Sequence, residues 1–401
     1  MSLKIDHVTF ASSGGAGIVA KTLWDFQNRL GNDVELHTLV DRGLRSDPMA
    51  HPILTAKASI DEFLIKSPKH KGMLSHMRRE FGSFSNLPLR ENSLVHLHWI
   101  EGVMTHYQVR NLLNQGRSVV WTLHDEAPFT GGCHSSLNCN NYHNLCQDCP
   151  AVRPLFVKRI LKSHEALIRA GLDATSIRLV TPSQWLKKAA ESSSVFRNLP
   201  VTLIGNPISI DYFSAPTREV ARRKLAIPDN TFVGIVVAAQ LDNPIKQVKR
   251  LAELFFEATH AHGFASKLLL IGANGDALDR VHGEVMWLGE LDALEISQIL
   301  PAADFLGSAS LSESAGMTVK EAGASGIPAI VFRNGGSEEL VDDGVSGFLV
   351  NDFGTFREKI LYLAQNPKHK FLLGKAAKES ALDAHPQTVA QKYLQFYEGV
   401  I

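Results

Sequence analysis

The chain has 401 residues, of which 44% are hydrophobic and 20% are charged, the composition of a globular protein with room for two domains. Its 41 Lys and Arg residues balance 41 Asp and Glu residues, and this zero net charge argues against nucleic-acid binding through bulk charge. No apolar run reaches about eighteen residues, which argues against a membrane-spanning helix. The first residues predict a strand and not a signal peptide, so we expect a cytoplasmic protein.

The first predicted elements are a strand over residues 5–11, a glycine-rich turn over residues 12–17 and a helix over residues 18–30. This order is typical of phosphate binding, because glycine lets a ligand approach the backbone closely. Gly14 and Gly15 are the candidate residues. The turn lacks the full GxGxxG pattern, so a tight turn without a ligand is an equal alternative.

Residues 59–84 predict a basic amphipathic helix that carries Lys66, Lys69, Lys71, Arg78 and Arg79. Such a helix can lie on an anionic membrane surface or bind the phosphate of a lipid-linked acceptor. The more common alternative is an ordinary solvated helix face.

Two predicted buried strands, over residues 93–100 and 118–124, end in polar side chains. His98, Trp99 and Glu101 end the first strand, and His124, Asp125 and Glu126 end the second. The carboxyl ends of parallel strands meet at one edge of a sheet, where ligands bind. A lone histidine is more often structural, but two strand-end histidines beside acids suggest a site.

All four cysteines lie in one loop, over residues 128–150: Cys133, Cys139, Cys146 and Cys149. The last two form the CxxC half of a metal knuckle, whereas the spacing of the first two is looser than usual. A reducing compartment favours metal over disulfides, so we expect a structural zinc, with His134 and His143 as spare ligands. Free thiols and a redox pair are the alternatives. The neutral charge argues against a zinc-ribbon nucleic-acid module.

The predicted domain boundary lies near residue 206, where strands give way to a loop-rich polar stretch up to residue 228. We expect a first domain over residues 1–205 and a second over residues 206–385. A last amphipathic helix lies in residues 386–401.

In the second domain, two strand ends carry charged candidates. A strand over residues 232–239 is followed by Lys246, and a strand over residues 302–309 is followed by Glu313. A helix then starts near Met317, with Glu321 about one turn inside. Carboxylates are natural acceptors for sugar or ribose hydroxyls, and helix-start amides suit phosphate. One alternative is that the carboxylates are helix-start acids that the helix dipole favours. The alternative for Lys246 is an ordinary surface lysine.

The residues just described carry a family resemblance. Glu-x7-Glu, then Gly-Ile-Pro-Ala-Ile-Val and Gly-Gly-Ser-Glu-Glu-Leu-Val-Asp-Asp-Gly-Val-Ser-Gly, resembles the retaining GT-B glycosyltransferases of family four, the group 1 glycosyltransferases. Thr-Leu-His-Asp-Glu before the four cysteines looks like the subgroup of bacterial polysaccharide and lipopolysaccharide transferases. The resemblance implies an α/β fold of two Rossmann-like doubly wound domains that face a central cleft. It also implies that the last helix crosses back onto the first domain.

The resemblance assigns roles to single residues. Glu313 would lie near the donor sugar, Glu321 would hold the nucleotide ribose, and Lys246 would bind the donor phosphates. His124 would face the sugar, with Asp125 as the group that orients its ring. Gln240 stands where the family commonly has an arginine, which removes one positive charge from the expected diphosphate site. Further donor-binding candidates are Gly14, Gly15, Ser314, Ala315, Gly316, Met317 and Asn206.

The sequence thus predicts a glycosyltransferase that moves a sugar from a nucleotide-diphosphate sugar, with retention, to a glycan or lipid-linked acceptor in cell-surface polysaccharide biosynthesis. No Asp-x-Asp pair occurs, so we expect no catalytic metal, and the only expected ion is the structural zinc. We expect no nucleic-acid partner and a peripheral contact at the inner face of the cell membrane. The alternatives are a nucleotide-sugar epimerase of the same fold and a non-catalytic nucleotide-sugar-binding protein.

Overall fold

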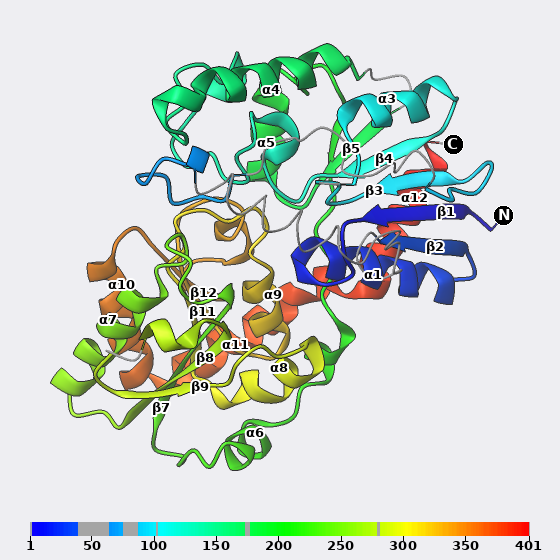
Figure 1. The fold of residues 1–401 in the computed structure, drawn as a ribbon. Helices are drawn as coiled ribbons and strands as arrows, with labels where there is room; N and C mark the ends of the chain where they lie inside the picture. Colours follow the sequence, from blue (N-terminus) through cyan, green and yellow to red (C-terminus); the bar gives the residue numbers. More distant parts are fainter. Residues whose placement is uncertain are drawn as a thin grey trace. The chain divides into compact units, whose positions relative to one another are not determined.

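The computed structural model describes residues 2–38, 64–74, 87–101, 103–172, 177–278 and 281–400. They form two compact units, one from Met1–Asn206 with Gln387–Ile401 and the other from Pro207–Pro386. Each unit is built on a six-stranded parallel sheet with helices on both faces (Figure 1). The predicted α/β class with two Rossmann-like domains is confirmed. No helix in the described ranges is long and apolar enough to cross a membrane.

The sheet of the first unit has the strand order β2-β1-β3-β4-β5-β6. Its strands are β1 (Lys4–Thr9), β2 (Asp33–Thr38), β3 (Leu94–Leu97), β4 (Val119–Thr122), β5 (Ile177–Thr181) and β6 (Val201–Leu203). The order changes direction between β1 and β3, because β1 pairs with β2 on one side and with β3 on the other. Ligands of open α/β sheets bind outside the carboxyl ends of the strands at such a switch point.

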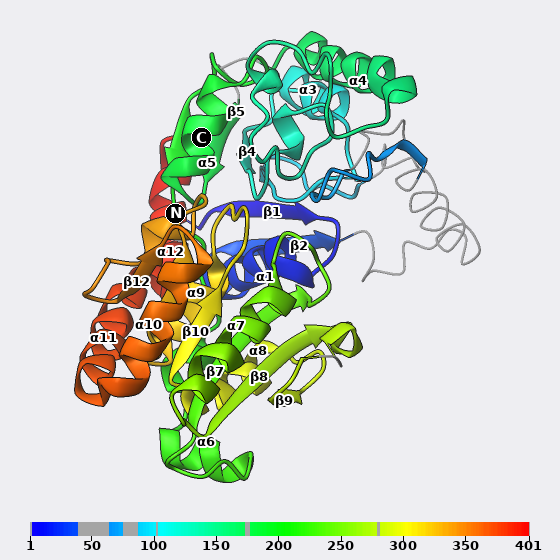
Figure 2. The same cartoon turned by 90° about the vertical axis from the view of Figure 1, so that its left-hand side faces the viewer.

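The helices of the first unit are α1 (Gly14–Arg29), α3 (His106–Asn114), α4 (Val157–Ala170), α5 (Gln184–Ser192) and α12 (Pro386–Glu398). α1 and α12 lie on one face of the sheet, and α3, α4 and α5 lie on the other (Figures 1 and 2). Successive side chains of a strand point to opposite faces. On β3, His96 therefore faces α12, where it contacts Tyr397, and Leu97 faces the apolar core.

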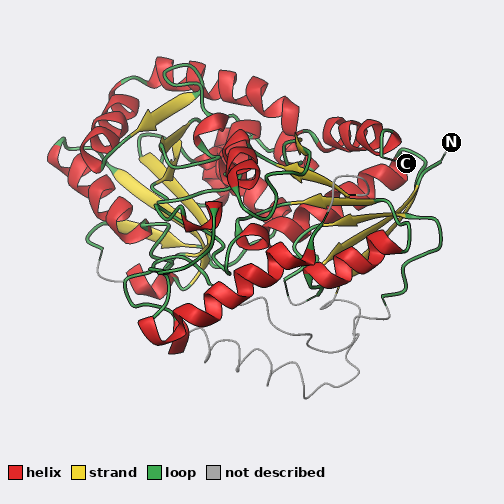
Figure 3. Cartoon of the chain, turned by 90° about the horizontal axis from the view of Figure 1, so that it is seen from above, coloured by secondary structure: helices red, strands yellow, loops and turns green. Residues whose placement is uncertain are grey.

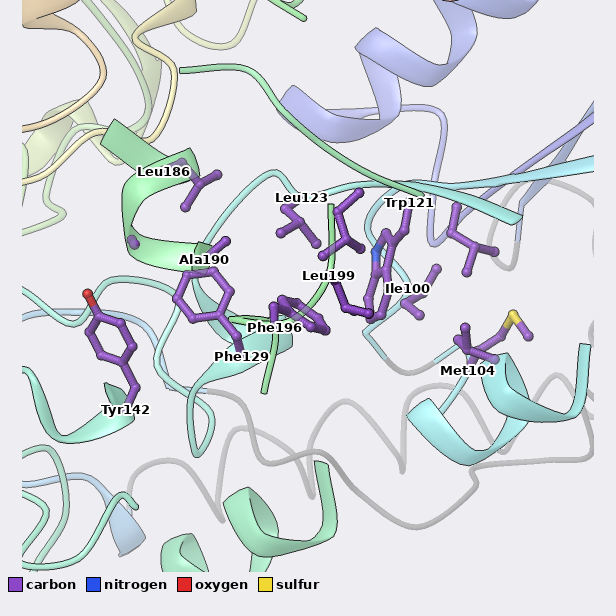
Figure 4. Close-up of a cluster of buried hydrophobic side chains, with 14 of the residues drawn as sticks. Ile100, Met104, Trp121, Leu123, Phe129, Tyr142, Leu186, Ala190, Phe196 and Leu199 are labelled. Atoms are coloured by element: carbon purple, nitrogen blue, oxygen red, sulfur yellow. The ribbon is translucent and has the colours of Figure 1, made fainter. Parts of the chain in front are cut away.

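The apolar core of the first unit lies between the sheet and α3, α4 and α5. Trp121 is fully buried there and packs edge-on against Phe196, which in turn contacts Phe129 (Figure 4). The Trp121 indole N–H donates to the backbone carbonyl of His98 (3.1 Å), so this large side chain also fixes the end of β3.

The sheet of the second unit has the order β12-β11-β10-β7-β8-β9. The strands of both sheets are drawn in yellow, with the helices in red, in Figure 3. Its strands are β7 (Phe232–Gln240), β8 (Ser266–Ala273), β9 (Glu284–Trp287), β10 (Phe305–Ser308), β11 (Ala329–Phe332) and β12 (Gly347–Val350). Its helices are α6 (Arg218–Lys224), α7 (Val248–Ala261), α8 (Ala293–Ile299), α9 (Met317–Ala324), α10 (Phe353–Gln365) and α11 (Pro367–Ser380). The switch point of this unit lies between β7 and β10, so the loops after these two strands meet there.

Two local predictions are wrong. The described part of the predicted helix 59–84 is mostly a loop, because residues 66 and 74 pair with Val152 and Cys133 as isolated bridges. Helix α1 starts at Gly14 and not after the glycine-rich turn. The Gly-Gly loop at residues 335–336 is followed by a three-residue 3₁₀ turn, Glu338–Leu340. Arg78 and Arg79 lie outside the described residues.

Candidate active site

The second unit brings two of the predicted site residues together at its switch point. Lys246 in the loop after β7 forms an ion pair with Glu313 in the loop after β10. The Ser310 hydroxyl donates to the same carboxylate oxygen (2.8 Å). Both charged side chains keep part of their surface exposed, 29% for Lys246 and 20% for Glu313, so the pair is held in place and still accessible.

The backbone of the two loops explains why the pair forms. The Leu311 N–H donates to the Ile245 carbonyl (2.8 Å), and the Gln247 amide donates to the Ala309 carbonyl (2.8 Å). These two bonds join the loops on both sides of Lys246. The strand order thus places a cation and an anion side by side, although 67 positions separate them in the chain.

Glycine is required on the other side of Glu313. Gly335 has a φ of +122°, and a Cβ there would lie 2.6 Å from the Glu313 carbonyl oxygen, which accepts a hydrogen bond from the Gly336 N–H (2.7 Å). Gly316, with a φ of +57°, precedes α9, and a Cβ there would lie 2.6 Å from Ser337 Cβ. The loop of Ser314, Ala315 and Gly316 before Met317 therefore packs directly on the Gly-Gly loop.

Glu321 lies one turn inside α9 and is half-buried. Burial raises its pKa from an ordinary 4.5 to about 7, although a hydrogen bond from Tyr212 opposes this rise. Burial and the facing Glu321 carboxyl raise the pKa of Tyr212, so the phenol stays protonated as the donor. A carboxyl group poised near neutral pH can accept hydrogen bonds from ribose hydroxyls once it is ionised.

The positive charge available beside this pair is limited. Gln240 ends β7 as an exposed neutral side chain. Arg250, on α7, contacts Glu253 and Glu257 and lies over the Phe353 ring. Its guanidinium is therefore engaged elsewhere, which leaves Lys246 as the cation paired with Glu313.

In the first unit, the amino end of α1 lies next to the switch point between β1 and β3. A Cβ at Gly14 or Gly15 would meet no heavy atom of the described residues within 4 Å, so these residues leave space beside this part of the backbone. Gly17 differs, because a Cβ there would lie 2.2 Å from the Ala11 carbonyl oxygen. Gly17 is thus needed for packing, whereas Gly14 and Gly15 leave room that a ligand could fill.

A chain of hydrogen-bonded histidines leads to His124. His124 Nε2 lies 3.1 Å from His98 Nδ1, and His98 Nε2 lies 2.9 Å from His7 Nδ1. His7 Nε2 lies 2.8 Å from Gln27 Oε1 on α1. Burial lowers the pKa of His7 and of His124 to about 4 and that of His98 well below its usual range. All three rings are therefore neutral at pH 7.

The far end of this chain of hydrogen bonds determines which ring nitrogen donates in each bond. Tyr397 on α12 lies 2.6 Å from His96 Nδ1, and a phenol is a good donor to imidazole. The same hydroxyl accepts from the Gln27 amide nitrogen (3.4 Å), which turns the Gln27 oxygen towards His7. His7 then donates from Nε2, and each following neutral ring donates from Nε2 to the Nδ1 before it. This network assigns His124 a protonated Nε2 and an Nδ1 lone pair that can accept from a sugar hydroxyl.

The expectation that Asp125 orients His124 is wrong. Asp125 instead accepts from the Trp99 indole (2.9 Å), the His134 ring (2.6 Å) and the Ala127 N–H (2.9 Å). Burial would raise the pKa of Asp125, but these partners hold it below its usual value. Asp125 therefore anchors the start of the cysteine loop, and His98 takes the orienting position.

Two groups of three potential metal ligands lie within 4.8 Å in the described part of the chain, and neither includes a cysteine. One group is His7, His96 and His98. All six of its ring nitrogens already have hydrogen-bond partners among Gln27, Thr122, Tyr397 and the histidines themselves. The other is Asp6, Glu35 and His37. Arg90 and Ser93 donate to Asp6. Both groups are therefore satisfied by the protein.

Asn206 and the four cysteines remain to be placed. Asn206 is the last residue of the first unit along the chain before the second unit starts, and its buried side-chain oxygen has no hydrogen-bond partner among the described residues. The four cysteines are free thiols that line one cavity. The spare ligands predicted beside them are engaged, since His134 contacts Asp125 and His143 contacts Ser192 (3.1 Å).

Several contacts of the site could not be found from the sequence. Tyr212 contacts Glu321, and His124 is linked through His98 and His7 to Gln27. The order of the strands brings these partners together, and their spacing in the sequence does not reveal it. Only Ser310 had a local signal, because it lies three residues before Glu313.

Comparison with known proteins adds the family. Residues 233–366 match the family Glycosyl transferases group 1. The N-acetyl-alpha-D-glucosaminyl L-malate synthase of Bacillus anthracis is 22% identical, over 100% of this chain and 97% of that protein. The alpha-monoglucosyldiacylglycerol synthase of Acholeplasma laidlawii is 25% identical, over 48% of each chain.

Solved structures extend the likeness to the whole chain at the level of the fold. The sucrose-phosphate synthase of Thermosynechococcus elongatus has a TM-score of 0.67 at 18% identity and covers 99% of this chain and 98% of its own. WaaG, a glycosyltransferase involved in lipopolysaccharide biosynthesis, has a TM-score of 0.64 at 14% identity, over 98% and 99% of the two chains. HepE of Anabaena in complex with UDP-glucose has a TM-score of 0.62 at 15% identity and covers 99% of this chain and 100% of its own. The fold of the chain is thus GT-B.

Proposed function

We propose that the protein is a retaining glycosyltransferase that moves a hexosyl unit from a nucleotide-diphosphate sugar to a glycan or lipid-linked acceptor in cell-surface polysaccharide biosynthesis. The observation that carries this proposal is the Lys246–Glu313 pair at the switch point of the second unit, with Glu321 one turn into α9. Both lie within residues 233–366, which match Glycosyl transferases group 1. HepE in complex with UDP-glucose supports the donor class, and WaaG supports the pathway.

Each side chain then has a distinct role. The Lys246 ammonium has three N–H donors, so it can hold Glu313 and a donor phosphate oxygen at once. Glu313, fixed by Lys246 and Ser310, accepts from hydroxyls of the sugar ring, and Glu321 accepts from the ribose. His124 offers its Nδ1 lone pair to a further sugar hydroxyl. The helix-start amides near Gly15 and Met317 face developing phosphate charge.

The transfer step follows from this charge distribution. The bond between the sugar anomeric carbon and the diphosphate oxygen breaks, and an oxocarbenium-like sugar forms while negative charge grows on the diphosphate. The acceptor hydroxyl attacks from the face that the diphosphate leaves, and its proton passes to the leaving phosphate oxygen. The configuration is retained without a covalent enzyme intermediate. A glycosyl-enzyme adduct found by mass spectrometry would contradict this route.

The first test is thermal stability with a panel of nucleotides and nucleotide sugars, beginning with UDP and UDP-glucose. A ligand at a hundred times its Kd adds about 2.7 kcal/mol of stability. We expect one nucleotide series to stabilise the wild type and a control, Glu358→Gln, which changes an exposed carboxylate on α10. Glu321→Gln should lose most of the shift. No shift in any series would overturn the donor assignment, and isomerisation of the donor alone would favour an epimerase.

A basic surface of the first unit supports a membrane-bound acceptor. Residues 64–74 and 150–163 contain no acid and seven cations: Lys66, Lys69, Lys71, Arg153, Lys158, Arg159 and Lys162. Backbone pairing of residues 65–67 with 151–153 makes the two segments neighbours. Three apolar side chains are exposed among them: Leu64, Met73 and Leu155, the last at 86%. Cations with interleaved apolar side chains fit an anionic lipid surface.

We propose that this basic surface docks the protein on the inner face of the cell membrane. The full chain should sediment with vesicles that contain phosphatidylglycerol, and added salt should release it. A triple change to glutamine at Lys158, Arg159 and Lys162 should abolish sedimentation. The matched triple change on α11 should not, at Lys368, Lys375 and Lys378. Equal binding by both variants, or binding to neutral vesicles, would contradict this placement.

A further inference from the structure

The loop between β4 and α4 gathers every cysteine of the chain around one small cavity. Cys133, Cys139, Cys146 and Cys149 all line it, and its volume of about 20 Å³ has room for roughly one water-sized particle. Cys146 and Cys149 are buried, and the side chains of Cys133 and Cys149 are in contact. The cavity walls are otherwise largely apolar, so the presence of four thiols at one place requires a chemical explanation.

A backbone amide points at one of the sulfurs. The Gly131 N–H donates to Cys146 Sγ (3.3 Å). A neutral thiol is a weak acceptor, whereas a thiolate is a strong one. An amide aimed at sulfur is what an anionic metal-binding thiolate requires from its surroundings.

A histidine from a distant segment completes the wall of the cavity. His70 lies in the loop 64–74, which pairs with the cysteine loop through the bridge between Leu74 and Cys133. His70 is one of the residues that line this cavity, and its Nε2 is buried without a hydrogen-bond partner in the described residues. A buried nitrogen without a partner is costly unless a polar group meets it. A metal-bound thiolate would supply an acceptor for the ring N–H.

We propose that the cysteine loop holds one structural Zn²⁺, with the thiolates of Cys133, Cys139, Cys146 and Cys149 as ligands and the His70 ring N–H as a donor to them. Zinc prefers four such ligands at about 2.3 Å in a tetrahedron. No three of these sulfurs lie within 4.8 Å of one another in the described residues, so binding of the ion would have to draw them together around one point. Binding displaces the four thiol protons. Because Asp125 and Glu126 hold His134 and Ser136 of the same loop, the ion would fix the loop beside His124.

Metal content of the full chain, purified without chelators, tests the proposal independently of activity. We expect about one zinc per chain by mass spectrometry of metals. X-ray absorption should show four sulfur neighbours at about 2.3 Å. Cys146→Ser and Cys149→Ser should fall below about a fifth of that stoichiometry. His143→Gln should keep its zinc, because His143 lies in the same loop and contacts Ser192 instead.

Two further measurements cover variants that fail to fold. The chain has no other cysteine, so titration of the native wild type with a mercurial should release one zinc as four thiols react. His70→Gln should keep the ion and lose it to a chelator about 10–100-fold more readily. Folded protein with less than about a tenth of a zinc and four freely reactive thiols would overturn the proposal. So would a disulfide between Cys133 and Cys149.

Discussion

The two units use opposite electrostatics at their switch points. In the second unit, Lys246 and Glu313 carry full charges and keep part of their surface exposed. In the first unit, burial keeps His7, His98 and His124 neutral. Charge is useful where a diphosphate leaves, and neutral hydrogen-bond groups are useful where sugar hydroxyls are positioned. Under the proposed function, the second unit would supply charged groups for the leaving diphosphate, and the first unit would supply neutral groups for sugar hydroxyls.

The largest expected effect on kcat comes from the charged Lys246–Glu313 pair of the second unit. Lys246→Ala should lower kcat about 10²–10³-fold, because it removes a cation that faces the leaving diphosphate. It should also leave the Glu313 carboxylate without its cation. Steady-state kinetics checks this, with Lys249→Ala, an exposed lysine on α7, as the control. Equal kinetics of Lys246→Ala and Lys249→Ala would contradict the role of Lys246 at the leaving diphosphate.

The neutral side should give a smaller and different effect. His98→Phe removes the acceptor for His124 Nε2–H while it keeps a ring in place, and we expect about a tenfold fall in kcat with little change in KM. Nitrogen NMR should show that His124 loses its single tautomer. His98→Asn places an oxygen near the lost Nδ1 and should restore part of both readouts. An unchanged His124 spectrum in His98→Phe would refute the relay.

The open backbone at the start of α1 gives a test that separates stability from binding. Gly15→Ala adds a Cβ that meets no heavy atom within 4 Å in the part of the chain that the structure describes, so the melting temperature should stay level or rise slightly. The same methyl group would project towards the donor, and KM for the donor should rise several-fold. A stable variant with unchanged KM would remove the Gly14–Gly15 turn from the donor site.

The smallest expected effect is a pH dependence. The Glu321 pKa of about 7 lies above the ordinary 4.5, so the unliganded protein loses stability as pH rises between these values. Ribose hydroxyls need the ionised carboxylate, so nucleotide affinity should rise as pH increases from 6 to 8. Calorimetry should detect proton release on binding at pH 6. Glu321→Gln should bind nucleotide more weakly, without the pH dependence of affinity and without proton release. A wild-type affinity that does not change with pH would contradict the role of Glu321.

The sequence predicts much of this picture because much of it is local. Glu313, Glu321 and the start of α9 lie on one strand–loop–helix unit, and hydrophobic runs predict the strands of both sheets. The error at Asp125 arises because a strand-end acid can turn to several neighbours, and here the loop supplies His134. Partners such as Tyr212 and Tyr397 depend on how distant segments pack, and no spacing rule reports that.

The most direct test of the central claim needs no acceptor. Wild-type protein is incubated with the stabilising nucleotide sugar, and proton NMR follows the slow transfer of the sugar to water. We predict that the sugar first appears with the anomeric configuration of the donor, and that Lys246→Ala slows its appearance about 10²-fold or more. A first product of inverted configuration would contradict the retaining mechanism. A donor that is isomerised instead of cleaved would contradict the transferase assignment itself.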